Sequence, residues 1–264
     1  MLARRVEQIK NEARGGWQNC FAVGPASWHR SRMISVVIPA LNAERTLPAT
    51  LTALVPAALD GIVREVVVVD GGSSDHTREI ADHAGAEVVT APANRGAQLR
   101  AGAHAARHPW LLFLNADTVL DQGWEREADS FIERAERGAS RHAAAAFRFA
   151  LDDDGLAPRV LEKLVRLRSS TLGLPYGDQG LLISRRRYDG AGGHRPLPLT
   201  EDTDLVRRLG MRRVKMLNAR AVGSASRYRR DGYLRGALAG AGQRLLYTLR
   251  QSPPRPSPLG GSDR

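Results

Sequence analysis

The sequence predicts an α/β protein built on a doubly wound, mostly parallel sheet with helices on both faces. Three observations predict this fold. Apolar stretches alternate with helix-like segments from residue 36 to residue 138, a pattern typical of successive βαβ units. Residues 66–69 are an unbroken run of valine, as expected of a strand buried on both faces. Acidic residues follow several of the apolar stretches, and parallel sheets bind ligands at that edge.

The first half predicts strands and helices in strict alternation. Each expected strand is short and apolar, and the helices between carry start signals, such as Pro48 in a first turn and Ser73-Ser74-Asp75 as a cap. Small residues mark one face of the helix expected at 94–107. The expected strands are 36–39, 65–70, 86–89 and 110–114, and the expected helices are about 44–59, 73–84, 94–107 and 123–138.

The second half is less regular and shows no repeat of fixed period. Its last expected helix, 233–250, carries a leucine stripe together with several arginines, which suits either a core-packing helix or a helix lying on anionic lipid. The expected strands are 143–151, 180–184, 213–217 and 221–224, and the other expected helices are 156–172 and 201–209.

Both ends of the chain differ from the middle. Residues 1–32 lack sustained periodicity, so we expect a disordered or mis-assigned extension, with Met33 as the native start. Residues 251–264 are rich in proline and glycine, and we expect them to be a disordered tail. One domain, residues 33–250, remains between them. No charge-free stretch is long enough to predict a membrane span.

Composition excludes some classes of protein. Cys20 is the only cysteine among 264 residues, which excludes an intrachain disulfide and a zinc site built on thiolates. The formal net charge of +11 favours anionic partners such as nucleic acid, lipid head groups or phosphorylated small molecules without choosing among them. Arginine-rich codon usage explains the charge equally well.

Carboxylates near strand ends are candidates for chemistry. Asp70 and Asp117 occupy such places, and the pair Glu201-Asp202 opens the late helix after residues 196–199. At this edge of a sheet a carboxylate can hold a metal or accept a hydrogen bond from a base or ribose. Mg²⁺ needs only one or two carboxylates plus substrate phosphates, so Asp117 alone is sufficient. Asn115 could hydrogen-bond to a ribose. Turn formation and helix capping are the alternative for each of these residues.

Arginines near a helix start suggest an anion site. Arg95 and Arg100 flank a glycine-containing first turn, and a helix amino terminus with guanidinium groups suits a diphosphate. A solvated basic face is the alternative. The histidines include no close pair suited to a metal, and we expect all of them at the surface.

Four segments in order resemble a known family. From Met33 to about Arg250 the chain resembles the family-two glycosyltransferases with a GT-A fold. Residues 175–180 and 201–209 further resemble a bacterial subgroup associated with radical-SAM or selenium-related gene clusters (the selenodomain-associated members). The segments that carry the family resemblance are VVIPALNAE (36–44), VVVDGGSSD (67–75), FLNADT (113–118) and ED (201–202).

The resemblance implies roles for individual residues. It implies that residues 33–120 bind the nucleotide and 121–250 the acceptor, and that the metal is Mg²⁺ or Mn²⁺. The resemblance implies that the nucleoside side of the donor is bound by Pro39, Ala40, Glu44, Asp70 and Asn115, with Asp70 on the base. It implies that Arg95 or Arg100 reaches the diphosphate and that Asp117 holds the metal. It further implies that Asp202 is the general base of an inverting displacement, and that the sugar or acceptor lies near Asp178, Gln179 and Glu201.

The sequence thus predicts an enzyme that transfers a single sugar from a nucleotide-sugar donor to an acceptor hydroxyl, which could be lipid-linked. Nucleic acid is not an expected partner, and the oligomeric state is open. We expect a cytoplasmic protein that could contact an anionic membrane through residues 233–250. The alternative is a non-catalytic protein of the same fold that binds a nucleotide sugar or an anionic surface. A methyltransferase is disfavoured, because Pro39-Ala40-Leu41-Asn42 is not the glycine-rich loop that such an enzyme needs after its first strand.

Overall fold

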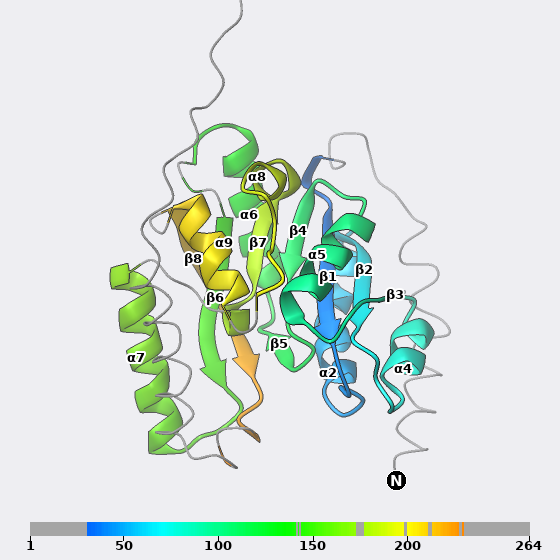
Figure 1. The fold of residues 1–264 in the computed structure, drawn as a ribbon. Coiled ribbons are helices and arrows are strands. Elements are labelled where there is room, and N and C mark those ends of the chain that lie inside the picture. The colour runs from blue at the N-terminus through cyan, green and yellow to red at the C-terminus, as the bar shows by residue number, and fades with distance from the viewer. Residues whose placement is uncertain are drawn as a thin grey trace, which may run out of the picture.

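The structure is a computed structural model that describes residues 31–140, 142, 144–172, 177–197, 200–210, 213–226 and 229. These residues form one sheet with helices packed on both faces (Figure 1). The eight strands of that sheet lie in the order β3-β2-β1-β4-β7-β6-β8-β5. The predicted doubly wound α/β fold is confirmed.

The sheet is parallel in its first half and mixed in its second. β1, β2, β3 and β4 are parallel to one another, and β6 is parallel to β8. β7 is antiparallel to both β4 and β6, and β5 is antiparallel to β8. The strands are β1 (Ile34–Ala40), β2 (Val63–Asp70), β3 (Glu87–Thr90), β4 (Trp110–Phe113), β5 (Thr118–Leu120), β6 (Ala144–Leu151), β7 (Leu181–Ser184) and β8 (Val214–Gly223).

Two hydrophobic cores cover the two faces of the sheet. One joins the sheet to α2, α3, α4 and α6, and the other joins it to α5, α8 and α9. A smaller cluster holds α7 against the end of β6. The helices are α2 (Leu47–Thr52), α3 (Val55–Leu59), α4 (Thr77–His83), α5 (Arg95–Ala105), α6 (Trp124–Glu136), α7 (Leu156–Leu172), α8 (Arg185–Gly190) and α9 (Glu201–Leu209), with a 3₁₀ turn, η2, at Gly177–Gln179.

Four details differ from the sequence prediction. The single helix expected at 44–59 is two short helices, α2 and α3, because each begins with a proline in its first turn and Pro56 restarts the chain after a break at Ala53. The strands expected at 213–217 and 221–224 are one strand, β8, whose register against β6 shifts in the middle. β5 and α8 were not predicted at all, since each is too short to show a period.

Helix α5 lies unusually close to the sheet. A Cβ atom on Gly102 would lie 2.4 Å from a methyl carbon of Val37 and 2.7 Å from one of Val69. At Gly96, a Cβ would meet the carbonyl oxygen of Arg195. Only glycine permits these approaches, so the small face predicted for this helix sets its distance from β1 and β2. The first turn of α5 is thereby fixed above the carboxyl ends of those strands.

Several predicted segments lie outside the described residues: nearly all of the extension 1–32, the helix 233–250 and the tail 251–264. Within the part that the structure describes, no helix is both long enough and apolar enough to cross a membrane.

Candidate active site

A cavity of about 430 Å³ opens at the carboxyl edge of the sheet. The loops after β1 and β4, the start of α5 and the start of α9 all contribute to its walls. The cavity therefore lies where doubly wound sheets bind ligands. Eight of the residues that line the cavity were predicted from the sequence: Pro39, Ala40, Arg95, Asn115, Asp117, Asp178, Glu201 and Asp202. The other lining residues are Leu41, Asn42, Ala43, Thr46, Gln98, Ala116, Thr203, Ser224 and Ser226.

The loops after β1 and β2 are fastened to each other. Asn42 has a left-handed backbone (φ 51°), and its side-chain oxygen accepts from the backbone N–H of Ser74 at 3.0 Å. The backbone N–H of Glu44 donates to Asp75. Local hydrogen bonds lower the pKa of the Asp75 carboxyl even though burial alone would raise it. Because Asn and Asp tolerate and stabilise such turns, these residues shape the rim of the cavity.

Asp70 lies beneath this rim. It is fully buried and accepts from the backbone N–H groups of Gly72 and Ser73 at 3.1–3.2 Å. It does not line the cavity, and these contacts are the turn contacts that were the alternative to base binding. Glu44 likewise lies outside the cavity lining, and its carboxylate contacts the backbone and ring nitrogens of His76.

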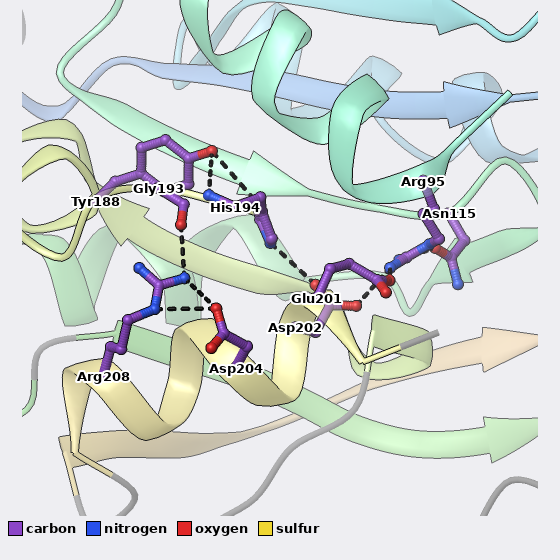
Figure 2. Close-up of polar contacts among 9 residues, drawn as sticks. All are labelled: Arg95, Asn115, Tyr188, Gly193, His194, Glu201, Asp202, Asp204 and Arg208. Carbon is purple, nitrogen blue, oxygen red and sulfur yellow. Dashed lines mark hydrogen bonds and ion pairs between the residues drawn. The ribbon is translucent and has the colours of Figure 1, made fainter. Parts of the chain in front are cut away.

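Arg95 is the centre of the polar cluster in the cavity. Its guanidinium donates to Glu201, to Asp202 Oδ2 at 2.5 Å and to Asn115 Oδ1 at 2.5 Å (Figure 2). Asn115 in turn donates to Asp178 at 3.1 Å. One arginine thus joins the first turn of α5, the loop after β4 and the first turn of α9.

The two adjacent carboxylates have opposite pKa shifts. Burial would raise the pKa of Asp202, but the charge of Arg95 and the hydrogen bond from His194 outweigh it and hold that pKa well below its usual range. Burial and the neighbouring charge of Asp202 raise the pKa of Glu201. Glu201 Oε2 is buried and has no hydrogen-bond partner among the described residues. The ionised form of Asp202 is thus favoured by Arg95 and His194, and the helix amino terminus favours it further.

His194 corrects the expectation that every histidine lies at the surface. Its side chain is completely buried, and its ring lies edge-on to Phe113, with 4.7 Å between the ring centroids. Nε2 lies 3.1 Å from Asp202 Oδ1, and Nδ1 lies 3.2 Å from the hydroxyl of Tyr188. The sequence could not reveal this, because the residues that bury His194 come from three separate elements.

Asp117 and Asp178 lie on the cavity wall next to the cluster. Asp117 follows β4 and is exposed, while Asp178 is half-buried on η2. The described residues contain no group of three His, Cys, Asp or Glu side chains arranged to hold a metal. An exposed single carboxylate beside a polar cavity nevertheless fits Mg²⁺ or Mn²⁺, since hard cations of this kind keep water ligands and take the rest from substrate phosphates.

Two predicted residues are placed elsewhere. Gln179 is buried, and its amide donates to the backbone oxygen of Phe147 at 3.0 Å, a contact that fixes the turn carrying Asp178. Arg100 is exposed and lines a second cavity of about 190 Å³ beside Tyr188. Of the two arginines proposed for a diphosphate, only Arg95 lines the larger cavity.

Gln98 is a site residue that the sequence analysis missed. Its amide donates to the backbone oxygens of Ala40 at 3.0 Å and Val69 at 2.9 Å. These are carbonyl groups at the carboxyl ends of β1 and β2, so Gln98 fastens α5 to both strands. A polar residue on the small face of the predicted helix was the one available signal.

Comparison with known proteins identifies the class of fold. Residues 35–140 match the family model described as Glycosyl transferase family 2. Crystal structures of glucosyl-3-phosphoglycerate synthase from Mycobacterium tuberculosis superpose on the chain with TM-scores of 0.56 and 0.55 at 20% and 21% identity. The first covers 84% of this chain and 86% of that one and contains Mn²⁺, UDP and glucosyl-3-phosphoglycerate. The other contains Mn²⁺, UDP-glucose and phosphoglyceric acid. The fold is therefore the GT-A fold.

Curated relatives match a shorter part of the chain. An uncharacterized glycosyltransferase of Mycobacterium tuberculosis is 35% identical over 107 residues, which is 40% of this chain and 45% of that protein. Glucosyl-3-phosphoglycerate synthase of the same species is 39% identical over 77 residues, which is 24% of each chain. The match thus spans less than half of each of these relatives.

Proposed function

We propose that the protein is a metal-dependent glycosyltransferase that moves one sugar from a nucleotide-sugar donor to an acceptor hydroxyl. One observation carries the proposal. A single cavity at the switch-point edge of a GT-A sheet brings together Asp117, the guanidinium of Arg95 and the carboxylates of Glu201 and Asp202. The reaction needs a metal ligand, a cation for the leaving diphosphate and a base.

The donor half of the reaction uses the loops after β1 and β4. Pro39 and Ala40 would form the floor under the nucleoside, and Asp117 would hold Mg²⁺ or Mn²⁺ together with the diphosphate. When bound, the metal neutralises charge that develops on the departing nucleoside diphosphate. UDP-glucose is the first donor to test, because the structurally similar synthase is described with UDP-glucose and Mn²⁺.

The acceptor half uses the first turn of α9. The acceptor oxygen forms a bond to the anomeric carbon as the bond from that carbon to the diphosphate oxygen breaks, and the hydroxyl proton passes to Asp202. In the structure, Arg95 neutralises Asp202. The donor diphosphate is an anion that competes for Arg95, so donor binding would free the carboxylate to accept the proton. Attack from the face opposite the leaving group inverts the anomeric centre.

Finer assignments are part of the same proposal. Residues 33–120 would bind the nucleotide and residues 121–250 the acceptor. The subgroup associated with radical-SAM or selenium-related clusters is proposed from the segments 175–180 and 201–209 alone. A lipid-linked acceptor, and a cytoplasmic protein in contact with anionic membrane, are proposed from the basic, leucine-striped segment 233–250.

The deciding experiment measures UDP release from UDP-glucose with Mn²⁺, with and without a panel of sugar, phosphorylated and lipid hydroxyl acceptors. UDP-, GDP- and TDP-sugars are first ranked by thermal shift with and without Mn²⁺. We expect stabilisation by one nucleotide class that depends on the metal, and release that increases with one acceptor class. Metal-dependent binding without release from any donor would favour the alternative, a non-catalytic nucleotide-sugar binding protein. The absence of both would contradict the proposal.

A further inference from the structure

A continuous chain of hydrogen bonds runs behind the cavity through three buried or nearly buried side chains. The Tyr188 hydroxyl lies 3.2 Å from Nδ1 of His194, and Nε2 of His194 lies 3.1 Å from Oδ1 of Asp202 (Figure 2). His194 is completely buried and does not line the cavity. His194 has no role in the proposed reaction as described above, yet both nitrogens of its buried imidazole have partners.

The direction of these hydrogen bonds follows from the donors. The backbone N–H of His194 donates to the Tyr188 hydroxyl oxygen at 3.0 Å. An ionised Asp202 can only accept at Oδ1, so His194 carries a proton on Nε2 and donates it there. In the neutral imidazole with that proton, Nδ1 is an acceptor, and the Tyr188 hydroxyl donates to it. The arrangement therefore selects one tautomer.

The turn that carries His194 is itself held in place by α9. Arg208, near the carboxyl end of that helix, donates to the backbone oxygen of Gly193 at 2.7 Å and to that of Ala191. Its charge is balanced by Asp204 at 2.6 Å. Gly192 and Gly193 have φ of 80° and 62°, a backbone that favours glycine. The helix that supplies Asp202 thus also fixes the turn that presents His194 to it.

The two oxygens of Asp202 have different partners. Oδ1 is taken by His194, whereas Oδ2 contacts Arg95, a residue of the cavity wall. When Arg95 turns to a donor diphosphate, Oδ2 alone loses its partner. Because a carboxylate that is held by one oxygen cannot rotate freely, Oδ2 keeps its orientation toward the cavity.

We propose that His194, fixed by Tyr188, is the positioning residue of Asp202: it holds Oδ1 so that Oδ2 faces the acceptor hydroxyl. This role rests on the proposed function in one respect, since it assumes that Asp202 accepts the proton. The charged groups that also face Asp202 are Arg95 and its neighbour Glu201. Arg95 leaves for the donor in the proposed cycle, and His194 remains.

The test compares His194→Phe, His194→Gln and Tyr188→Phe with the parent chain. His194→Phe keeps a buried ring but has no donor, so kcat should fall about 10- to 100-fold with the KM for the donor unchanged. Glutamine can place an N–H near the position of Nε2 and should restore most of kcat. Tyr188→Phe removes the hydroxyl that donates to Nδ1 and accepts from the backbone N–H of His194, and a smaller fall in kcat is expected.

Ser35→Ala is the matched control. Ser35 is buried, donates to Glu65 at 2.5 Å and lies at the amino end of β1, away from the cavity. It should lower the melting temperature without changing kcat. If His194→Phe does not fold, Tyr188→Phe and His194→Gln still decide the matter. Normal kcat in folded His194→Phe, or equal losses in the phenylalanine and glutamine variants, would overturn the positioning role.

Nitrogen NMR of the histidine ring separates this inference from the proposed function. We expect the neutral tautomer with a proton on Nε2 in the parent chain near pH 7.5, and a changed Nε2 resonance in Asp202→Asn. If no donor is turned over by the parent chain, the proposed function fails. The NMR result then decides alone: the expected tautomer supports the hold on Asp202, and an Nδ1–H tautomer or a freely exchanging imidazolium overturns it.

Discussion

Arg95 and Asp202 are 107 positions apart in the chain, yet Nη1 of the arginine lies 2.5 Å from Oδ2 of the aspartate. The arginine is the first residue of α5, and the aspartate lies in the first turn of α9. Two helix amino termini thus converge on one cavity, and one cation neutralises the carboxylates presented by the second.

Removal of Asp117 should abolish the metal-dependent part of nucleotide binding. Asp117→Ala removes an exposed side chain, so the melting temperature should hardly change, while the gain in UDP affinity with Mn²⁺ should disappear because no carboxylate anchors the ion. Isothermal titration of UDP with and without Mn²⁺ measures this. Asp82→Ala, on the exposed side of α4, is the control and should behave like the parent. Unchanged metal dependence in folded Asp117→Ala would remove this residue from the site.

Substitution of Asp202 should slow chemistry more than binding. Asp202→Asn keeps the shape of the side chain but cannot accept the proton, so turnover should fall by about 10²- to 10⁴-fold with donor binding nearly intact. Steady-state rates with titration of the donor give both quantities. Glu201→Gln is the paired variant. Should Glu201→Gln lose turnover while Asp202→Asn keeps it, the base is Glu201, and normal rates in both would contradict the inverting mechanism.

Replacement of Arg95 should reverse the pH dependence of stability at this site. In the parent, the pKa of Asp202 is lowered, so its contribution to stability is present above the unfolded pKa of about 4 and is lost as pH falls. The pKa of Glu201 is raised, so the contribution of Glu201 to stability is lost as pH rises. In Arg95→Met both carboxylates are buried without their cation, both pKa values rise, and stability should fall as pH rises through them.

The measurement is the melting temperature of parent and Arg95→Met from pH 5 to pH 8. The difference between them should grow with pH. Arg137→Met removes an exposed cation that pairs with Glu133 on the surface of α6, and its effect should be small and nearly independent of pH. A difference for Arg95→Met that shrinks toward pH 8 would mean that the carboxylates do not titrate as described.

The close approach of α5 to the sheet should make Gly102 intolerant of a methyl group. Alanine favours a helix by about 1 kcal/mol over glycine, but here its Cβ would overlap Val37 and Val69, and overpacking costs about 1–3 kcal/mol. We expect Gly102→Ala to lower the free energy of unfolding in urea. Gly190→Ala in α8, where the added carbon would meet no atom within 4 Å beyond the neighbouring residues and backbone of its own helix, should be neutral or stabilising. Equal effects would contradict the packing argument.

A chain beginning at Met33 should fold. Arg32 forms an ion pair with Asp129 on α6 at 3.1 Å, so its removal should cost at most about 1 kcal/mol, or about 2–4 °C in melting temperature. A chain beginning at Ser31 retains the pair and should melt like the full sequence. Thermal denaturation of the three proteins measures this, and a larger loss in the Ser31 protein would show that residues 1–30 stabilise the domain.

Much of the fold could be predicted because its signals are local. The valine run at 66–69 and the apolar stretch at 110–114 predict strands by composition alone, since a strand buried on both faces needs no alternation. The order of strands and helices then predicts the parallel half of the sheet. The break between α2 and α3 shows the limit of such signals. Pro56 lies within the single helix that was expected, but in the structure it is in the first turn of a second helix.

The sequence by itself determined which chemical groups follow the strands of the parallel half, because the carboxyl ends of parallel strands meet at one edge of the sheet. Asn115 and Asp117, which follow the apolar stretch at 110–114, were found in this way. The pair Glu201-Asp202 opens a helix and was found from the family resemblance of its segment. Only the tertiary structure decided which of them touch. Arg95 faces the cavity and Arg100 does not, Asp70 holds a turn, and His194 lies buried behind Asp202. Contacts between elements about a hundred residues apart depend on how helices pack on the sheet, and packing depends on the shapes of many side chains at once.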